Sequence, residues 1–145
     1  MEDNPIYPND QLGGVSVSNS FLTVGALASE YGGEMVSSFS NYGKENVDVF
    51  APGSDVWSCK PNNEYDFASG TSMAAPAVSG VAGLVRSYYP QLSTAEVKMI
   101  LMNSGLPIKK TVVVGEDGSA VPFSSISKSG SMVNAYNALV LASKK

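Results

Sequence analysis

One serine, Ser72, stands where a segment of small residues passes into a predicted helix. The segment reads ASGTSMAAPAVSG, from Ala68 to Gly80. The first N–H groups of a helix have no intrahelical acceptor, and the helix dipole favours negative charge at that end. A serine hydroxyl beside such donors can attack a carbonyl group, because the oxygen that becomes an anion finds its donors already in place. The pattern therefore predicts a nucleophile at Ser72, although Thr71 or Ser72 could instead be a helix cap.

The sequence GTSMAAP, from Gly70 to Pro76, resembles the nucleophile signature of the subtilisin-like serine proteases, the subtilases. The resemblance implies that Ser72 is the catalytic nucleophile and that its own N–H is one oxyanion donor. It also implies that substrate-binding backbone lies at Ser69, Gly70 and Thr71. The implied reaction is hydrolysis of a peptide bond through an acyl-enzyme on Ser72.

Other short motifs extend this resemblance over nearly the whole chain. They lie at Val24–Ala26, Phe39–Gly43, Ala51–Gly53 and Gly130–Ala135. The implied fold class is α/β: part of the subtilisin-like parallel-sheet, three-layer fold, with a buried central helix that starts at the nucleophile. In the family, the catalytic aspartate, the histidine and an oxyanion-hole asparagine precede the serine. Residues 1–145 therefore resemble the C-terminal portion of a subtilase catalytic domain.

The chain contains no histidine. A catalytic serine needs a base to take its proton and to pass that proton to the leaving amine. We therefore expect the isolated chain to be inactive, and we expect the serine endopeptidase activity to belong to a parent protein that supplies the rest of the triad. The alternative is a non-catalytic remnant or pseudo-protease that acts as a structural or interaction piece.

Composition excludes several other classes of function. The formal net charge of −4 argues against nucleic acid as a partner, because phosphate binding needs clustered basic residues. No apolar run is long enough to span a membrane, and the first four residues are too polar to begin a signal peptide. The single cysteine, Cys59, excludes an internal disulfide, supports no metal site and is expected to pack in a strand. No cofactor is expected, and an extracellular or cell-envelope location is implied by the resemblance alone.

The elements that must position Ser72 are two strands, a hairpin and a helix. Apolar runs at 21–27 and 47–53 predict strands of a covered parallel sheet, the second ended by Pro-Gly. Residues 56–67 read as a hairpin that delivers the chain to Ser69. The central helix is expected from Ser72 to Tyr88, and its lack of charge before Arg86 predicts that it is buried on all sides.

Around these elements we expect supporting structure. A capping box at Ser93–Glu96 begins a helix that Gly105 ends, with an apolar stripe of Val97, Ile100, Leu101 and Ser104. Asn134 should cap a last helix. The remaining expectations are an exposed hairpin at 111–123, a flexible link at 124–131, loops at 4–10 and 11–18, a buried Phe39 and a structural rather than catalytic Asp48.

Two kinds of macromolecular partner follow from this interpretation. The first is a polypeptide substrate, and the second is the missing N-terminal half of the catalytic domain. A parallel sheet cut in half would leave an unpaired edge and uncovered apolar faces. We therefore expect the isolated chain to self-associate or to be only marginally stable.

Overall fold

The computed structural model describes residues 11–12, 15–115 and 117–145. Its centre is a four-stranded sheet in the order β3 (Val24–Leu27), β4 (Val49–Pro52), β10 (Ser131–Met132) and β7 (Leu106–Pro107). β4 runs parallel to both β3 and β10, and β7 is antiparallel to β10. Both apolar runs thus form parallel strands, and the chain is α/β, as predicted. The loop expected at 4–10 lies outside the described residues.

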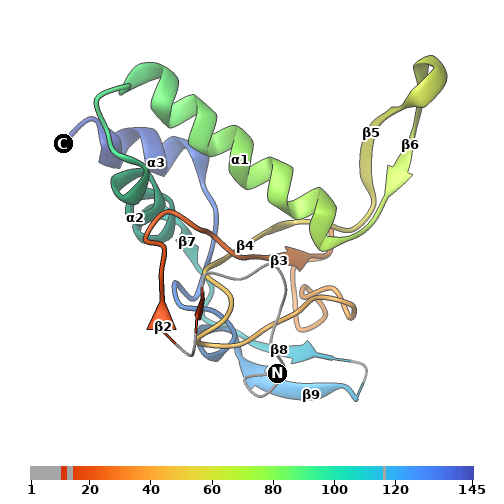
Figure 1. Ribbon diagram of the computed structural model, residues 1–145. Helices are drawn as coiled ribbons and strands as arrows, with labels where there is room; N and C mark the ends of the chain where they lie inside the picture. Colours follow the sequence, from red (N-terminus) through yellow and green to blue (C-terminus); the bar gives the residue numbers. More distant parts are fainter. Residues whose placement is uncertain (1–10, 13–14, 116) are drawn as a thin grey trace.

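Each face of this sheet packs against a different layer. The long helix α1 (Thr71–Tyr88) covers one face, and α2 (Thr94–Ser104) and α3 (Ala135–Ala142) lie near its C-terminal end (Figure 1). The hairpin of β8 (Thr111–Val114) and β9 (Ser119–Pro122) lies on the other side of the sheet. Two short strands, β1 (Gln11–Leu12) and β2 (Val15–Ser16), pair near the start of the chain.

The layers enclose two apolar clusters. The first joins α1 to β3, β4, α2 and α3, and its fully covered members include Ala26, Ala51, Ala74, Val85 and Ala138. The second lies under the β8–β9 hairpin and includes Phe50, Val112, Val114, Phe123 and Ile126. Phe50 and Phe123 meet with ring centroids 5.1 Å apart.

Two expectations about the second layer prove wrong. The hairpin at 111–123 is not simply exposed, because Val112, Val114 and Phe123 are buried. The link at 124–131 is packed rather than loose, with Ile126 and Ser127 buried. A short 3-10 helix, Phe123–Ser125, leads from the hairpin into this link. The Lys44 ammonium donates to the Ser124 and Ser127 carbonyls of the link.

Phe39 is 49% exposed, whereas the neighbouring Ser40 is buried. The Ala26 N–H on β3 donates to the Ser40 hydroxyl at 2.8 Å, and that hydroxyl donates to the Asn41 carbonyl. The serine turns inward because it satisfies a backbone donor of β3 that would otherwise be buried without a partner. The prediction that Phe39 is buried is therefore wrong.

The predicted central helix is present, but its burial is one-sided. Ala74, Val78 and Val85 are buried against the sheet and the other helices. The opposite flank is exposed: Ala75, Ala77, Gly80, Gly83 and Leu84. The expectation of burial on all sides is wrong for this chain, because no element of the described part of the chain covers that flank.

Both helix caps follow the sequence prediction. Ser93 and Glu96 form the capping box of α2, whose buried residues are the four predicted. The Asn134 carboxamide oxygen accepts from the Asn137 N–H at 2.8 Å and caps α3. Local sequence therefore fixed where these helices begin.

Replacing Ser93 by alanine is expected to lower the free energy of unfolding by about 1 kcal/mol, because it removes the acceptor of the Glu96 N–H. The backbone N–H and hydroxyl of Ser93 both donate to Glu96, which holds the pKa of that carboxyl below its ordinary value of 4.5. A lowered folded-state pKa contributes stability above the unfolded value, and this contribution is lost as the pH falls. Urea denaturation at pH 7 and pH 3 measures both effects. The stability difference between wild type and Ser93→Ala should shrink at pH 3. No difference at pH 7 would contradict the capping role, and an equal difference at both pH values would contradict the contribution of the Glu96 carboxylate.

Candidate active site

Ser72 is exposed at the second position of α1. The N-cap of this helix is Gly70, whose φ of 156° and ψ of 160° suit glycine, and none of the described side chains caps the helix. The simple interpretation of Thr71 or Ser72 as a cap is therefore wrong. The hydroxyl of Ser72 has no hydrogen-bond partner among the described residues.

Backbone donors gather at this helix end. The Met73 and Ala74 N–H groups donate to the Gly70 carbonyl at 2.9 and 3.3 Å. The N–H groups of Thr71 and Ser72 precede this first bonded turn and belong to the part of a helix that has no intrahelical acceptor. Donors are thus placed beside the Ser72 hydroxyl, as stabilisation of a developing oxyanion requires.

The loop before the serine is bonded to the end of β4. The Gly70 N–H donates to the Gly53 carbonyl at 2.7 Å. A methyl group on Gly53 would lie 2.7 Å from the Ala26 Cβ and 2.9 Å from the Gly70 carbonyl oxygen. Only glycine at position 53 therefore allows the loop this close approach to the sheet.

A second bond holds the base of the hairpin that precedes the loop. This hairpin consists of β5 (Val56–Lys60) and β6 (Glu64–Ala68), joined at the 3-10 turn Pro61–Asn63. The exposed Ser69 accepts the Asp55 N–H on its hydroxyl at 2.9 Å. Ser69, Gly70 and the half-buried Thr71 thus form one continuous backbone segment leading into Ser72.

The described residues place no histidine beside Ser72. The chain contains none, and the carboxylate of Asp48 is buried 24 residues upstream in a different setting. Asp48 accepts the Thr23 N–H at 2.9 Å, and the ammonium groups of Lys98 and Lys128 lie 3.3 and 3.2 Å from its two oxygens. These contacts confirm that Asp48 is a structural residue.

We also looked among the described residues for a metal site, a transmembrane helix and a buried cysteine. No group of three histidine, cysteine, aspartate or glutamate side chains there could hold a metal ion. None of the helices described is both long and apolar enough for a transmembrane span. Cys59 is exposed on β5, so the expectation that it packs is wrong.

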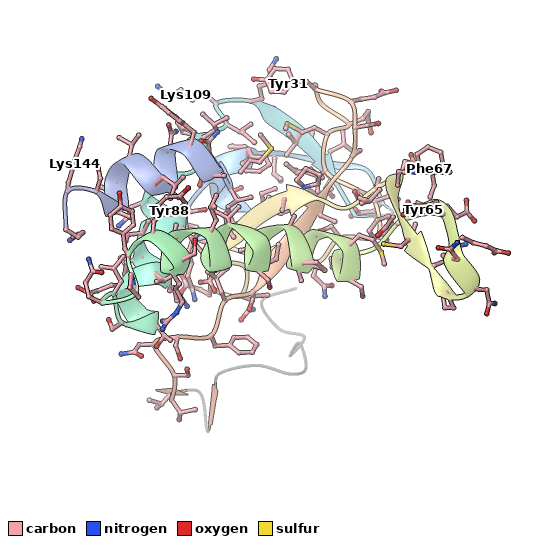
Figure 2. All side chains as sticks on the ribbon, turned by 90° about the horizontal axis from the view of Figure 1, so that it is seen from above. Tyr31, Tyr65, Phe67, Tyr88, Lys109 and Lys144 are labelled. Atoms are coloured by element: carbon pink, nitrogen blue, oxygen red, sulfur yellow. The ribbon has the colours of Figure 1, made fainter. Side chains whose placement is uncertain are left out.

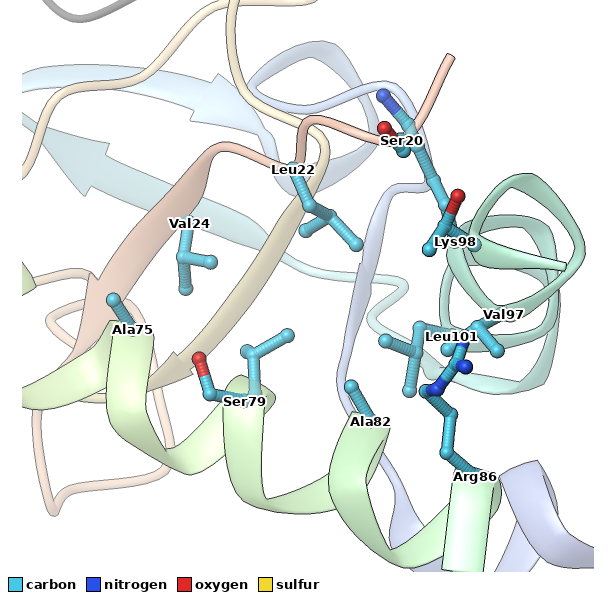
Figure 3. Close-up of a pocket in the computed structure, with 12 residues that line it drawn as sticks. Ser20, Leu22, Val24, Ala75, Ser79, Ala82, Arg86, Val97, Lys98 and Leu101 are labelled. Carbon is cyan, nitrogen blue, oxygen red and sulfur yellow. The ribbon is translucent and has the colours of Figure 1, made fainter. Parts of the chain in front are cut away.

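One apolar cavity of about 220 Å³ lies beside the open flank of α1 (Figure 3). Ala75, Val78 and Ala82 of α1 line it, together with Leu22, Val24, Val97 and Leu101. Its polar side chains, among them Ser79, Arg86 and Lys98, form no acid–base pair with Ser72. The cavity begins one turn along the helix from Ser72 and offers an apolar surface rather than catalytic groups.

Comparison with known proteins identifies the family of this chain. The Subtilase family profile matches residues 7–130. The chain is 43% identical over 100 residues to the halolysin-like extracellular serine protease Nep of Natrialba magadii, covering 69% of this chain and 18% of that protein. It is 38% identical over 98 residues to subtilisin DY of Bacillus licheniformis, covering 68% of this chain and 34% of that protein.

Solved structures agree with the sequence relatives. A chain from the structure of the subtilase cytotoxin SubAB superimposes with a TM-score of 0.72 at 26% identity, covering 96% of this chain and 42% of that one. The patellamide maturation protease PatA gives a TM-score of 0.66 at 27% identity, covering 86% and 44%. This chain thus spans less than half the length of each of these relatives. From its profile match, its relatives and its fold, the chain belongs to the subtilase family.

Proposed function

We propose that this chain supplies the nucleophile, Ser72, of a serine endopeptidase whose histidine and aspartate lie in a segment outside the chain. The observation that carries the proposal is the exposed Ser72 hydroxyl beside the first N–H groups of α1, which have no intrahelical acceptor. Membership of the subtilase family supports the same reaction class. An extracellular site of action is part of the proposal, since one relative is named an extracellular protease.

In this reaction the Ser72 oxygen attacks the carbonyl carbon of a peptide bond while a histidine takes the hydroxyl proton. The carbonyl oxygen becomes an oxyanion and accepts a hydrogen bond from the Ser72 N–H. Collapse of the intermediate releases the amine, which takes the proton from the histidine, and leaves an acyl group on Ser72. Water then releases the acid by the same steps. Ser69, Gly70 and Thr71 would lie along the polypeptide substrate.

The exposed flank of α1 is the second reason to expect a partner, because a partner would cover it. Its exposed residues are small or apolar, and the cavity beside it is lined mainly by apolar side chains. The partner that carries the histidine must bring that side chain to the Ser72 oxygen, at the N-terminal end of the same helix. We propose that this partner is the remaining part of a subtilase catalytic domain. Without this partner, the chain would self-associate through the same flank.

A second candidate function is a non-catalytic remnant or pseudo-protease. The absence of histidine from the chain favours it. Both candidates predict an inactive isolated chain, so the test must also supply the missing groups. A chimera in which this chain replaces the matching segment of subtilisin DY does so.

Intact mass after treatment with a fluorophosphonate tests the proposal. We expect no adduct on the isolated chain, because no base activates Ser72, and one adduct on the folded chimera. Ser72→Ala should abolish that adduct. Ser87→Ala is the matched control, since Ser87 is exposed on the same helix about 22 Å away. A folded chimera without an adduct would favour the remnant, and an adduct that survives in Ser72→Ala would place the nucleophile elsewhere.

A further inference from the structure

The β5–β6 hairpin extends away from the rest of the molecule beside the N-terminal end of α1 (Figure 1). Three large rings on it are exposed: Trp57, Tyr65 and Phe67, at 58%, 61% and 59%. We call them the aromatic face. Soluble domains seldom leave several adjacent aromatic side chains uncovered, and such patches mark interaction sites.

The strand register places the three rings on one side of the hairpin. Trp57 pairs with Phe67, and Tyr65 pairs with Cys59, two residues along from Trp57. The Trp57 ring centroid lies 4.8 Å from that of Phe67 and 6.4 Å from that of Tyr65. Figure 2 shows Tyr65 and Phe67 together on the hairpin, beyond the start of α1. The rings therefore form one continuous surface rather than three separate exposures.

The charged residues of the hairpin lie on its other side. Lys60 pairs with Glu64 in the register, and the Lys60 ammonium forms an ion pair with the Asp66 carboxylate. Alternation along each strand directs these side chains away from the aromatic face. The aromatic face itself carries no charge, so it suits apolar side chains and not a charged ligand.

Two hydrogen bonds join the base of the hairpin to the loop that precedes Ser72. The Asp55 N–H donates to the Ser69 hydroxyl, and the Gly70 N–H donates to the Gly53 carbonyl, so both strands are tied at their base. Phe67 precedes Ser72 by five residues, which limits their separation to about 18 Å. A segment bound on the aromatic face therefore lies within about 18 Å of Ser72.

We propose that the aromatic face is an accessory binding surface for the polypeptide substrate and that it favours substrates with apolar side chains a few residues from the cleaved bond. This proposal rests on the proposed function, because a polypeptide is the ligand that Ser72 brings to this end of the molecule. The rings occupy three residues along each strand, 57–59 opposite 65–67, so the face is about 10 Å long and spans about three residues of an extended substrate. Aromatic rings bury large areas and gain from contact with apolar side chains.

Trp57 makes the binding step directly measurable, because it is the only tryptophan of the chain. The probes are two ten-residue peptides without tryptophan: one alternates leucine with serine, and its matched control has glutamine in place of leucine. With the full chain, we expect the leucine peptide to shift Trp57 emission saturably to shorter wavelength, and the glutamine peptide to leave it unchanged. Absence of a saturable shift with the leucine peptide would overturn the proposal.

Variants locate the binding surface. Tyr65→Ser combined with Phe67→Ser keeps the Trp57 probe and should raise the Kd about tenfold. Glu64→Gln, on the opposite side of the hairpin, should leave the Kd unchanged. Equal binding by the double variant would overturn the proposal. So would a blue-shifted emission without peptide that follows dimer formation in sedimentation, because a second copy would then cover the face.

The chimera separates this proposal from the assignment of Ser72. In it, the double variant should raise KM about tenfold for carboxymethylated casein. It should not change kcat or KM for a dipeptide nitroanilide, which is too short to reach from Ser72 to the aromatic face. Equal effects on both substrates would show a disturbed active site and overturn the proposal. A folded chimera without hydrolysis, alongside intact peptide binding by the chain, would instead contradict the proposed function.

Discussion

Replacing Ser72 by alanine in the chimera is expected to lower kcat for a tetrapeptide nitroanilide by roughly a millionfold, the scale found for loss of the nucleophile in subtilisin itself. The hydroxyl forms the covalent bond to the acyl group, and alanine offers no atom for that bond. KM should change little, because the backbone that binds substrate is retained. Steady-state kinetics, with active-site titration of the parent chimera, measure both quantities.

The structural cost of this substitution should be small. Ser72 is exposed and its hydroxyl makes no hydrogen bond among the described residues. Equal melting temperatures of the two chimeras would show that the loss is chemical. Ser87→Ala should retain full kcat. A Ser72→Ala chimera with kcat within a hundredfold of the parent would contradict the assignment, because donors and binding alone cannot supply that rate.

The second large effect concerns the buried carboxylate of Asp48, which is 2% exposed. Lys98 donates to Asp48 Oδ2 at 3.3 Å and to the Phe21 carbonyl, with its side chain 13% exposed. The Lys128 ammonium lies 3.2 Å from Oδ1, but its direction does not meet the geometry of a hydrogen bond. We therefore regard Lys128 as a charge contact and Lys98 as the principal partner.

Lys98→Met should lower the free energy of unfolding by about 3 kcal/mol, because methionine keeps the apolar stem but leaves a buried charge without its main partner. Urea denaturation of the chain, at a concentration where it is monomeric, measures the loss. Lys128→Met is the matched control. Its side chain is 37% exposed, so water screens the pair, and the loss should stay below about 1 kcal/mol.

The relative size of the two losses is the decisive quantity. A larger loss for Lys128→Met than for Lys98→Met would contradict this account of the ion pairs. Asp48→Asn should also destabilise the chain, since it leaves the buried Lys98 ammonium without its counter-charge. None of these variants touches Ser72, so fluorophosphonate labelling of the folded chimera should persist in each.

Much of the local structure could be predicted from the sequence. Ser93 with Glu96, and Asn134 with Asn137, mark helix starts because the bonds they make span only three residues. The hairpin around Pro61–Asn63 is equally local, and Asn62 and Asn63 adopt the positive φ that its turn needs. Likewise, the small residues around Ser72 predict the start of α1.

Exposure could not be predicted in the same way, because it depends on which distant segments meet. The apolar sequence of α1 predicts burial on all sides, yet the described chain covers one flank. Phe39 and Ser40 exchange their expected places because the N–H of Ala26, 14 residues away, needs the serine hydroxyl. Val112 and Phe123 are buried because the segment 111–123 packs against Phe50 of β4.

The sequence by itself determined the family, the nucleophile candidate and the lack of a histidine base, because these depend on residue identity and short spacing. The tertiary structure alone decided that the N-cap is Gly70, that Lys98 meets Asp48 across 50 residues, and that the rings of Trp57, Tyr65 and Phe67 share one exposed face. The physical reason is that side chains acquire their neighbours through strand pairing and helix packing, which bring together residues far apart in the chain.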